Sequence, residues 1–114
     1  MTINEPATYQ NLTPQQVKTK LAEDSSVRFI DVREVQEHVL AHIDGAELLP
    51  MSQSQQWLAT LSHDEEIIFF CHSGIRSERV ASYLAHQLGY TNIANMLGGI
   101  DAWSLDIDPN VPQY

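Results

Sequence analysis

One segment carries most of the information about this fold: EIIFFCHSGIRSERVASYLAHQLG, over residues 66–89. Its first part, residues 67–71, is continuously apolar, which is typical of a strand covered on both faces in the middle of a parallel sheet. Its last part, residues 75–88, has apolar side chains at helical spacing and is followed by Gly89, a common helix terminator. The segment therefore predicts a strand and a helix joined by a tight loop.

The same alternation of strands and helices continues on both sides of this segment. Apolar runs predict strands at residues 27–32, 46–49 and 93–97. Capping-box patterns at residues 13–16 and 52–55 predict two helix starts, and residues 34–40 are predicted to form a short helix. Apolar side chains share one face of each predicted helix: Val17 and Leu21; Val35 and Val39; Trp57, Leu58 and Leu61; and Val80, Ala81, Leu84 and Leu88, which are expected to line the inner face of the longest helix.

Strands that alternate with helices at this spacing indicate an α/β fold built on a mainly parallel sheet. No repeat or linker divides the chain, so residues 1–114 are predicted to form one domain. Its core should span residues 9–104, with a short turn at 101–103, and residues 105–114 should form a surface tail. Ligands of such folds bind at the carboxyl ends of strands, the edge at which both Asp31 and Cys71 are expected.

The composition argues against several classes of function. The chain has 114 residues, 43% of them hydrophobic, and a formal net charge of −9, with only six Lys and Arg residues. Nucleic acids and anionic membrane surfaces require clustered cations, so neither partner is expected. No apolar run is long enough to span a membrane. Residues 1–10 lack a secretory signal, and one cysteine forms no internal disulfide, which together predict a cytoplasmic protein.

Cys71, the only cysteine, stands between the predicted strand and the predicted helix. A thiol in this position faces the positive end of the helix dipole and the unpaired N–H groups of the first turn. This setting favours the thiolate, which is the nucleophilic form of cysteine. The alternative is a buried structural cysteine. The glycine and the arginine that follow argue against it, because a core position needs neither a flexible loop nor a charge.

The residues that follow Cys71 are suited to holding an anion. Gly74 allows a positive φ and a close approach of the backbone to a ligand. Successive N–H groups of the loop can converge on a negative charge. Arg76 adds a permanent cation whose planar fork suits sulfonyl or phosphoryl oxygens. Residues 71–76 are therefore a candidate anion-binding loop with a nucleophile at its base.

Other polar residues each allow two interpretations. Asp31 and Arg33 could contact substrate, but a pairing that shapes the rim of the site is favoured. His72 could donate a proton or contact an anion, or its side chain could point into water. His38 and His42 have the spacing of a helical metal pair, but no Cys, Asp or Glu completes a ligand set. No metal and no other cofactor is predicted.

Four motifs give the chain a resemblance to the single-domain rhodaneses, a family of sulfurtransferases. They span residues 31–103 in the family's order. One departure is Ala41, where the family usually has Gly, which costs a little backbone freedom. The motifs are Asp31-Val32-Arg33-Glu34; His42-Ile43-Asp44-Gly45-Ala46, similar to G-H-I-x-G-A; residues 71–77 as the active-site loop; and Gly98-Gly99-Ile100-Asp101-Ala102-Trp103, similar to G-G-x-x-x-W.

The resemblance implies a three-layer domain, with a central and mainly parallel sheet of about five strands flanked by helices. It implies that the thiolate of Cys71 is catalytic, takes the outer sulfur of a small anionic donor such as thiosulfate, and becomes a persulfide. Cyanide or another thiol would then remove this sulfur. Asp31 and Arg33 would support the rim. The implied substrate-binding residues are His72, Ser73, Gly74, Ile75, Arg76 and Ser77.

Two other functions stay open at the level of sequence. A Cys-dependent phosphatase or arsenate reductase of related fold carries C-x5-R, whereas four residues separate Cys71 from Arg76. The shorter cradle suits a persulfide better than a phosphoryl group. Alternatively, the domain is mainly a binding or sulfur-relay module, which accepts persulfide from a partner protein and has little activity on small donors.

Overall fold

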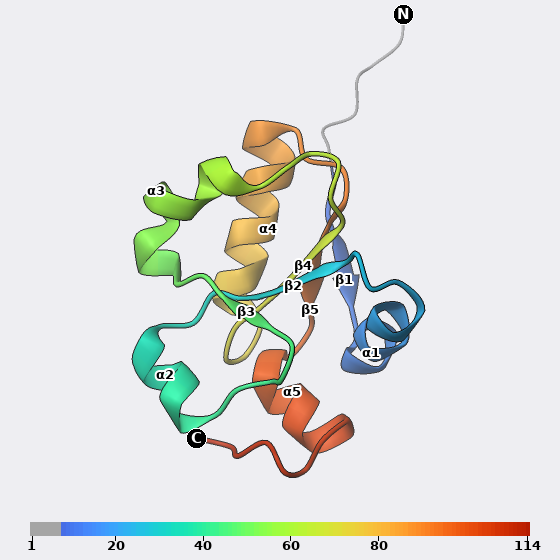
Figure 1. The fold of residues 1–114 in the computed structure, drawn as a ribbon, viewed down its shortest axis with the longest axis vertical. Helices are drawn as coiled ribbons and strands as arrows, with labels where there is room; N and C mark the ends of the chain where they lie inside the picture. The colour runs from blue at the N-terminus through green and yellow to red at the C-terminus, as the bar shows by residue number, and fades with distance from the viewer. Residues whose placement is uncertain (1–7) are drawn as a thin grey trace, which may run out of the picture.

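The computed structural model describes residues 8–114 and shows a five-stranded sheet between two layers of helices (Figure 1). The strand order is β1-β5-β4-β2-β3, and every neighbouring pair is parallel. The strands are β1 (Gln10–Leu12), β2 (Arg28–Asp31), β3 (Glu47–Leu48), β4 (Ile67–Phe70) and β5 (Ile93–Met96). The helices are α1 (Pro14–Glu23), α2 (Val35–Leu40), α3 (Ser54–Trp57), α4 (Ile75–Leu88) and α5 (Gly99–Asp106), with 3-10 turns at Met51–Gln53 and Leu58–Thr60.

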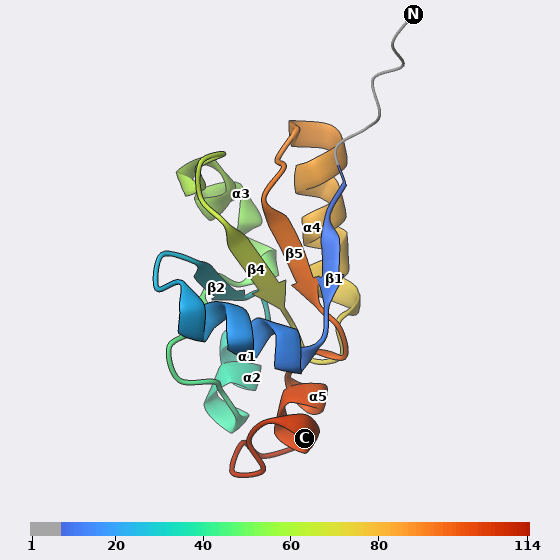
Figure 2. The ribbon, with the colours of Figure 1, turned by 90° about the vertical axis from the view of Figure 1, so that its right-hand side faces the viewer.

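The central strand β4 supplies side chains to two separate cores. Ile68 and Phe70 pack into the core that includes residues of α1 and α5, whereas Ile67 and Phe69 pack into the core that includes residues of α3 and α4. All four side chains are fully buried. The two helical layers are visible on opposite faces of the sheet in Figures 1 and 2. The predicted α/β fold, with a strand covered on both faces, is confirmed.

The two predicted capping boxes have different outcomes. At the start of α1, the hydroxyl of Thr13 accepts from the N–H of Gln16, and the side chain of Gln16 accepts from the N–H of Thr13. The prediction at residues 52–55 is wrong. There, the N–H and hydroxyl of Ser52 both donate to the carboxylate of Glu34, so the serine is not available as a cap. The following helix α3 is only one turn long and has no side-chain cap.

Two elements are absent from the sequence prediction. Strand β1 has three residues, which is too short for a recognisable pattern, but it pairs with β5 along its whole length. The predicted turn at 101–103 is wrong, because α5 begins at Gly99 and continues to Asp106. Ile100 and Trp103 lie on one face of this helix and are buried in the core beside α1. Their burial stabilises a helix whose sequence is otherwise weakly patterned.

Three apolar side chains at helical spacing are exposed, and of these Leu88 was predicted to lie on an inner face. Val35 and Val39 of α2 are 52% and 77% exposed, because α2 lies beyond the carboxyl edge of the sheet rather than over one of its faces. No residue of α2 is buried. Leu88 is the last residue of α4 and is largely exposed at that end of the helix. Helical spacing predicted the helices correctly here but not the surfaces they cover.

The predicted surface tail at residues 105–114 also needs correction. Leu105 is exposed, but Val111 is only 7% exposed and packs into the same core as Trp103. The hydroxyl of Ser104 donates to the carbonyl oxygen of Val111 at 2.5 Å, which fixes the returning chain. The tail then ends at Tyr114, beside α2 (Figure 1).

The prediction that residues 1–10 carry no secretory signal lies mostly outside the described residues. Within residues 8–114, no helix has the length and apolarity needed to cross a membrane.

Candidate active site

Cys71 follows the last residue of β4 and precedes α4, at the carboxyl edge of the sheet. The residue is 1% exposed. The N–H of Gly74 donates to its sulfur at 3.2 Å, and the N–H of Ser77 donates at 3.4 Å. Two backbone dipoles therefore point at Sγ from the loop and from the first turn of α4. Such an arrangement stabilises negative charge on the sulfur.

Gly74 and the start of α5 determine the shape of this loop. Gly74 has a φ of +99°, which side chains with a Cβ rarely adopt. The carbonyl oxygen of Cys71 accepts from the N–H of Ile100 at 2.9 Å, and that of His72 accepts from the N–H of Asp101 at 3.1 Å. A Cβ at Gly99 would overlap both carbonyl groups. The first turn of α5 thus fixes the backbone at Cys71 and His72.

A buried polar chain lies behind the sulfur. The hydroxyl oxygen of Ser77 is 3.4 Å from Sγ of Cys71 and 2.6 Å from Oδ1 of Asn95. The amide of Asn95 in turn donates to Asn11 at 3.1 Å. A hydroxyl has one proton, so Ser77 donates to only one of its two neighbours at a time. Sequence reasoning missed Asn95, although an asparagine within an otherwise apolar strand was a usable signal.

Arg76 does not point freely into the site. Its Nη1 and Nη2 atoms donate to the two carboxylate oxygens of Glu37, at 2.7 and 2.9 Å, so the guanidinium is held by a forked ion pair. The hydrogen bonds from Arg76 lower the pKa of Glu37 to about 2. The same pair raises the pKa of Arg76. The loop that follows Cys71 thus carries a cation, but α2 supplies a carboxylate that neutralises it.

Asp31 and Arg33 form a buried ion pair, with 2.7 Å between Nη2 and Oδ2. Arg33 is 0% exposed, and its five N–H groups all have acceptors within the protein. These acceptors are the carboxylate of Asp31, the carbonyl oxygens of Glu37 and Ala41, and the hydroxyl of Tyr114. No donor of Arg33 is left for a ligand, and its hydrogen bonds connect β2, α2 and Tyr114. Ala41 has an extended backbone, so alanine in place of the family's usual glycine is not strained there.

His72 does not project into open water. Nε2 of its ring is 3.1 Å from a carboxylate oxygen of Asp101, and the ring stacks on Tyr114 with centroids 4.0 Å apart and planes 11° apart. The exposed members of the loop are Ser73 and Ile75, and the latter is 63% exposed. Tyr114 was missed by sequence reasoning, because no local pattern connects the last residue of the sequence with a loop after β4.

His38 and His42, the two histidines with the spacing of a helical metal pair, lie side by side. The rings of His38 and His42 stack with centroids 5.0 Å apart, and Nε2 of His42 is 3.3 Å from Asp44. No group of three or more metal-ligating side chains exists in the described part of the chain, residues 8–114.

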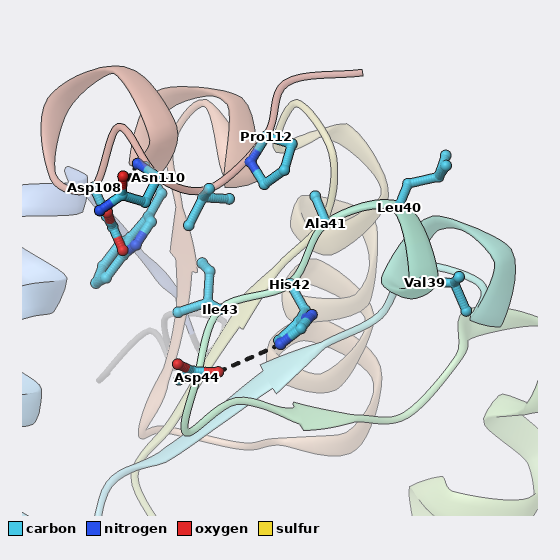
Figure 3. Close-up of a pocket in the computed structure, with 11 residues that line it drawn as sticks. Val39, Leu40, Ala41, His42, Ile43, Asp44, Asp108, Asn110 and Pro112 are labelled. Carbon is cyan, nitrogen blue, oxygen red and sulfur yellow. Dashed lines mark hydrogen bonds and ion pairs between the residues drawn. The ribbon is translucent and has the colours of Figure 1, made fainter.

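A groove of about 410 Å³ lies next to α2, between residues 39–44 and the C-terminal segment (Figure 3). Cys71 is not among its lining residues. His42 and Asp44 face each other on one wall, and Asp108, Asn110 and Pro112 form the opposite wall. The groove is therefore separate from the sulfur, although both lie near α2.

Comparison with known proteins gives a consistent result. A family model described as "Rhodanese-like domain" matches residues 13–106. A putative sulfurtransferase, YtwF of Bacillus subtilis, is 36% identical over 93 residues, and the alignment covers 82% of this chain and 88% of that protein. The thiosulfate sulfurtransferase GlpE of Haemophilus influenzae is 30% identical over 95 residues, covering 83% of this chain and 88% of GlpE.

Other relatives are longer. A probable adenylyltransferase/sulfurtransferase, MoeZ of Mycobacterium tuberculosis, is 31% identical over 105 residues, which are 90% of this chain but 26% of that protein. The chain thus spans about a quarter of MoeZ. Among solved structures, a rhodanese-like domain protein from Staphylococcus aureus superposes with a TM-score of 0.75 and 28% identity, covering 92% of this chain and 98% of that one.

Proposed function

Since this chain belongs to the rhodanese-like family of sulfurtransferases, we propose that it carries a sulfane sulfur as a persulfide on Cys71. The observation that supports this most directly is the pair of N–H groups, from Gly74 and Ser77, that point at Sγ. They stabilise a thiolate on Sγ before loading and again when the sulfane sulfur has left. The other members of the proposed substrate-binding loop are His72, Ser73, Ile75 and Arg76.

The first half of the reaction loads the cysteine. The thiolate of Cys71 attacks the outer sulfur of thiosulfate, forms an S–S bond, and breaks the bond between the two sulfur atoms of the donor. Sulfite leaves with the electron pair of that bond. One thiolate and one dianion are converted into one persulfide anion and one dianion, so the charge balances and no external oxidant is needed.

The second half unloads the cysteine. Cyanide, or the thiolate of an acceptor, attacks the terminal sulfur of the persulfide and forms thiocyanate or a new persulfide. The S–S bond to Cys71 breaks, and the electron pair returns to Sγ as a thiolate. Because loading and unloading are separate steps on one covalent intermediate, ping-pong kinetics are expected. We place this activity in the cytoplasm, with a small sulfur donor and a thiol or cyanide acceptor as its partners, and without a cofactor.

A relay module is the second candidate, and one contact favours it. Glu37 holds the guanidinium of Arg76, so the loop has less free positive charge for a small anion than its sequence indicates. A relay would take its sulfur from a persulfide on a partner protein. The phosphatase candidate is disfavoured by the same contact, because an arginine that is forked onto a carboxylate is not available to clamp a phosphoryl group in the same way.

Thiocyanate formation from thiosulfate and cyanide tests the proposed activity. We expect turnover by the unmodified protein and only the uncatalysed background with Cys71→Ser, because serine cannot carry sulfane sulfur. Arg79→Gln is a suitable control, since Arg79 is an exposed residue of α4 outside the contacts described above. Equal rates for the unmodified protein and Cys71→Ser would overturn the proposal.

A further inference from the structure

We infer that Glu37 and Tyr114 set the donor specificity of the Cys71 site, by holding Arg76 in an ion pair so that organic persulfides are better donors than the dianion thiosulfate. This inference rests on the proposed function and adds a class of substrate to it. Neither residue belongs to the active-site loop. Glu37 lies in the middle of α2, and Tyr114 lies at the far end of the C-terminal segment.

The ion pair neutralises the positive charge of Arg76, which a small anionic donor would need. Both terminal nitrogens of Arg76 donate to Glu37, one to each carboxylate oxygen. The side chains are 32% and 21% exposed, so neither is fully screened by water. The net charge of the pair is zero, and the whole chain carries −9. A dianion that approaches Cys71 therefore meets no uncompensated cation from Arg76.

Tyr114 fixes the carboxylate in this position. Its hydroxyl donates to Oε2 of Glu37 at 2.8 Å and accepts from Nη1 of the buried Arg33 at 2.9 Å. Its ring is stacked on His72 of the active-site loop. The tyrosine thus connects Glu37 to a rigid buried arginine and to the loop itself. Freed from this hydroxyl, the carboxylate of Glu37 would have more rotamer freedom to leave Arg76.

The surroundings of the pair are suited to an organic donor. Ile75, which precedes Arg76 in the loop, is 63% exposed and offers an apolar contact. An organic persulfide has an apolar portion that can use this side chain, and its reacting sulfur carries at most one negative charge. The sulfur transfer itself is balanced: the thiolate of Cys71 takes the terminal sulfur, the S–S bond of the donor breaks, and the donor leaves as a thiolate.

The test measures the loading of Cys71 by mass spectrometry, as a second-order rate constant for each donor in the absence of an acceptor. Thiosulfate is the inorganic donor and cysteine persulfide is the organic one. In the unmodified protein, we expect faster loading by cysteine persulfide. In Glu37→Gln, loading by thiosulfate should rise about tenfold at low salt, because a free guanidinium attracts the dianion, and the gain should shrink as salt is added. Loading by cysteine persulfide should rise by only about threefold, because Coulomb attraction scales with charge and this donor carries one negative charge rather than two.

Two further variants keep the test decisive. Tyr114→Phe retains the stacked ring but loses the hydroxyl, and it should raise the thiosulfate-to-persulfide ratio by about twofold because Glu37 is less firmly held. This variant decides the question if Glu37→Gln does not fold. Glu23→Gln, at the exposed end of α1, makes the same change in net charge elsewhere and should leave the ratio unchanged.

The possible results separate the two proposals. The inference is overturned if Glu37→Gln and Tyr114→Phe both leave the thiosulfate-to-persulfide ratio unchanged, or if loading by thiosulfate falls in Glu37→Gln. Loading of the unmodified protein by either donor would still support the proposed function. An equal rise of the thiosulfate-to-persulfide ratio in Glu23→Gln also overturns the inference, because the effect would then come from net charge alone. Failure of both donors to load the unmodified protein overturns the proposed function and the inference with it.

Discussion

Arg33 and Arg76 both donate to carboxylates, but the first arginine is buried and the second is partly exposed. Arg33 is completely buried, and all its donors are used within the protein, so it fixes the junction between β2 and α2. Arg76 is partly exposed, and its partner Glu37 lies on an exposed helix. The first pair is part of the framework, whereas the second can be altered without leaving a fully buried charge unpaired.

The Glu37–Arg76 pair predicts how the free energy of unfolding depends on pH. The pair lowers the pKa of Glu37 from 4.5 to about 2, so its stabilising contribution is complete above pH 4.5 and is lost as the pH falls toward about 2. At neutral pH, Glu37→Gln should reduce the free energy of unfolding by about 2 kcal/mol, a value discounted for solvent screening. The difference should disappear at acid pH.

Urea unfolding of the unmodified protein and of Glu37→Gln across this pH range provides the measurement. Glu23→Gln, an exposed carboxylate outside the network, is the matched control and should show little pH-dependent difference. A difference for Glu37→Gln that is constant from neutral to acid pH would contradict the assignment of the ion pair.

At the scale of elements, the start of α5 determines the shape of the nucleophile loop. Its first N–H groups bind the carbonyl oxygens of Cys71 and His72, and Gly99 allows the approach. Gly99→Ala places a Cβ where those carbonyl groups lie, and it strains a φ of +60°. We therefore expect slower loading of Cys71 together with a loss of stability.

Gly89→Ala is the matched control for this prediction. Gly89 also has a positive φ, +73°, but a Cβ there would meet no atom within 4 Å. It should cost about 1 kcal/mol of stability from backbone strain and leave the loading rate of Cys71 unchanged. Equal loading rates in the two alanine variants would contradict the role assigned to the start of α5.

Elements with a strong local pattern were predictable from the sequence, and those defined by tertiary contacts were not. The run at residues 67–71 predicted β4 with both faces covered, and the Thr13 capping box predicted the start of α1. β1 is specified by pairing with β5, and α5 by the burial of Ile100 and Trp103. α2 is exposed because it lies beyond the carboxyl edge of the sheet, and helical spacing alone does not predict that position.

The same distinction holds for the candidate site. The positions of Cys71 and of the loop followed from a local strand–loop–helix pattern, because the nucleophile and its N–H donors are neighbours in sequence. The partners of that loop come from distant segments. Glu37 precedes Arg76 by 39 residues, and Tyr114 returns from the C-terminal segment. A sequence pattern showed that Arg76 is a cation but not that the fold supplies its counter-ion.

At the scale of the whole molecule, the parallel sheet brings the carboxyl ends of β2 and β4 to one edge, where the Asp31–Arg33 pair and Cys71 lie. The net charge of −9 surrounds this edge with a field that disfavours anions. Within this field, the site has two N–H groups that point at the sulfur, and the charge of Arg76 is neutralised by Glu37. This combination suits a site that stores sulfur on its own cysteine more than one that clamps a large anion.

The most direct test of the central claim is intact-protein mass spectrometry after incubation with thiosulfate in the absence of an acceptor. We expect a gain of one sulfur atom, which peptide analysis maps to Cys71. Cyanide should remove this sulfur, and Cys71→Ser should not gain it. A protein that gains no sulfur from thiosulfate and none from cysteine persulfide, or a Cys71→Ser variant that gains sulfur equally, would contradict the assignment of Cys71 as a sulfur carrier.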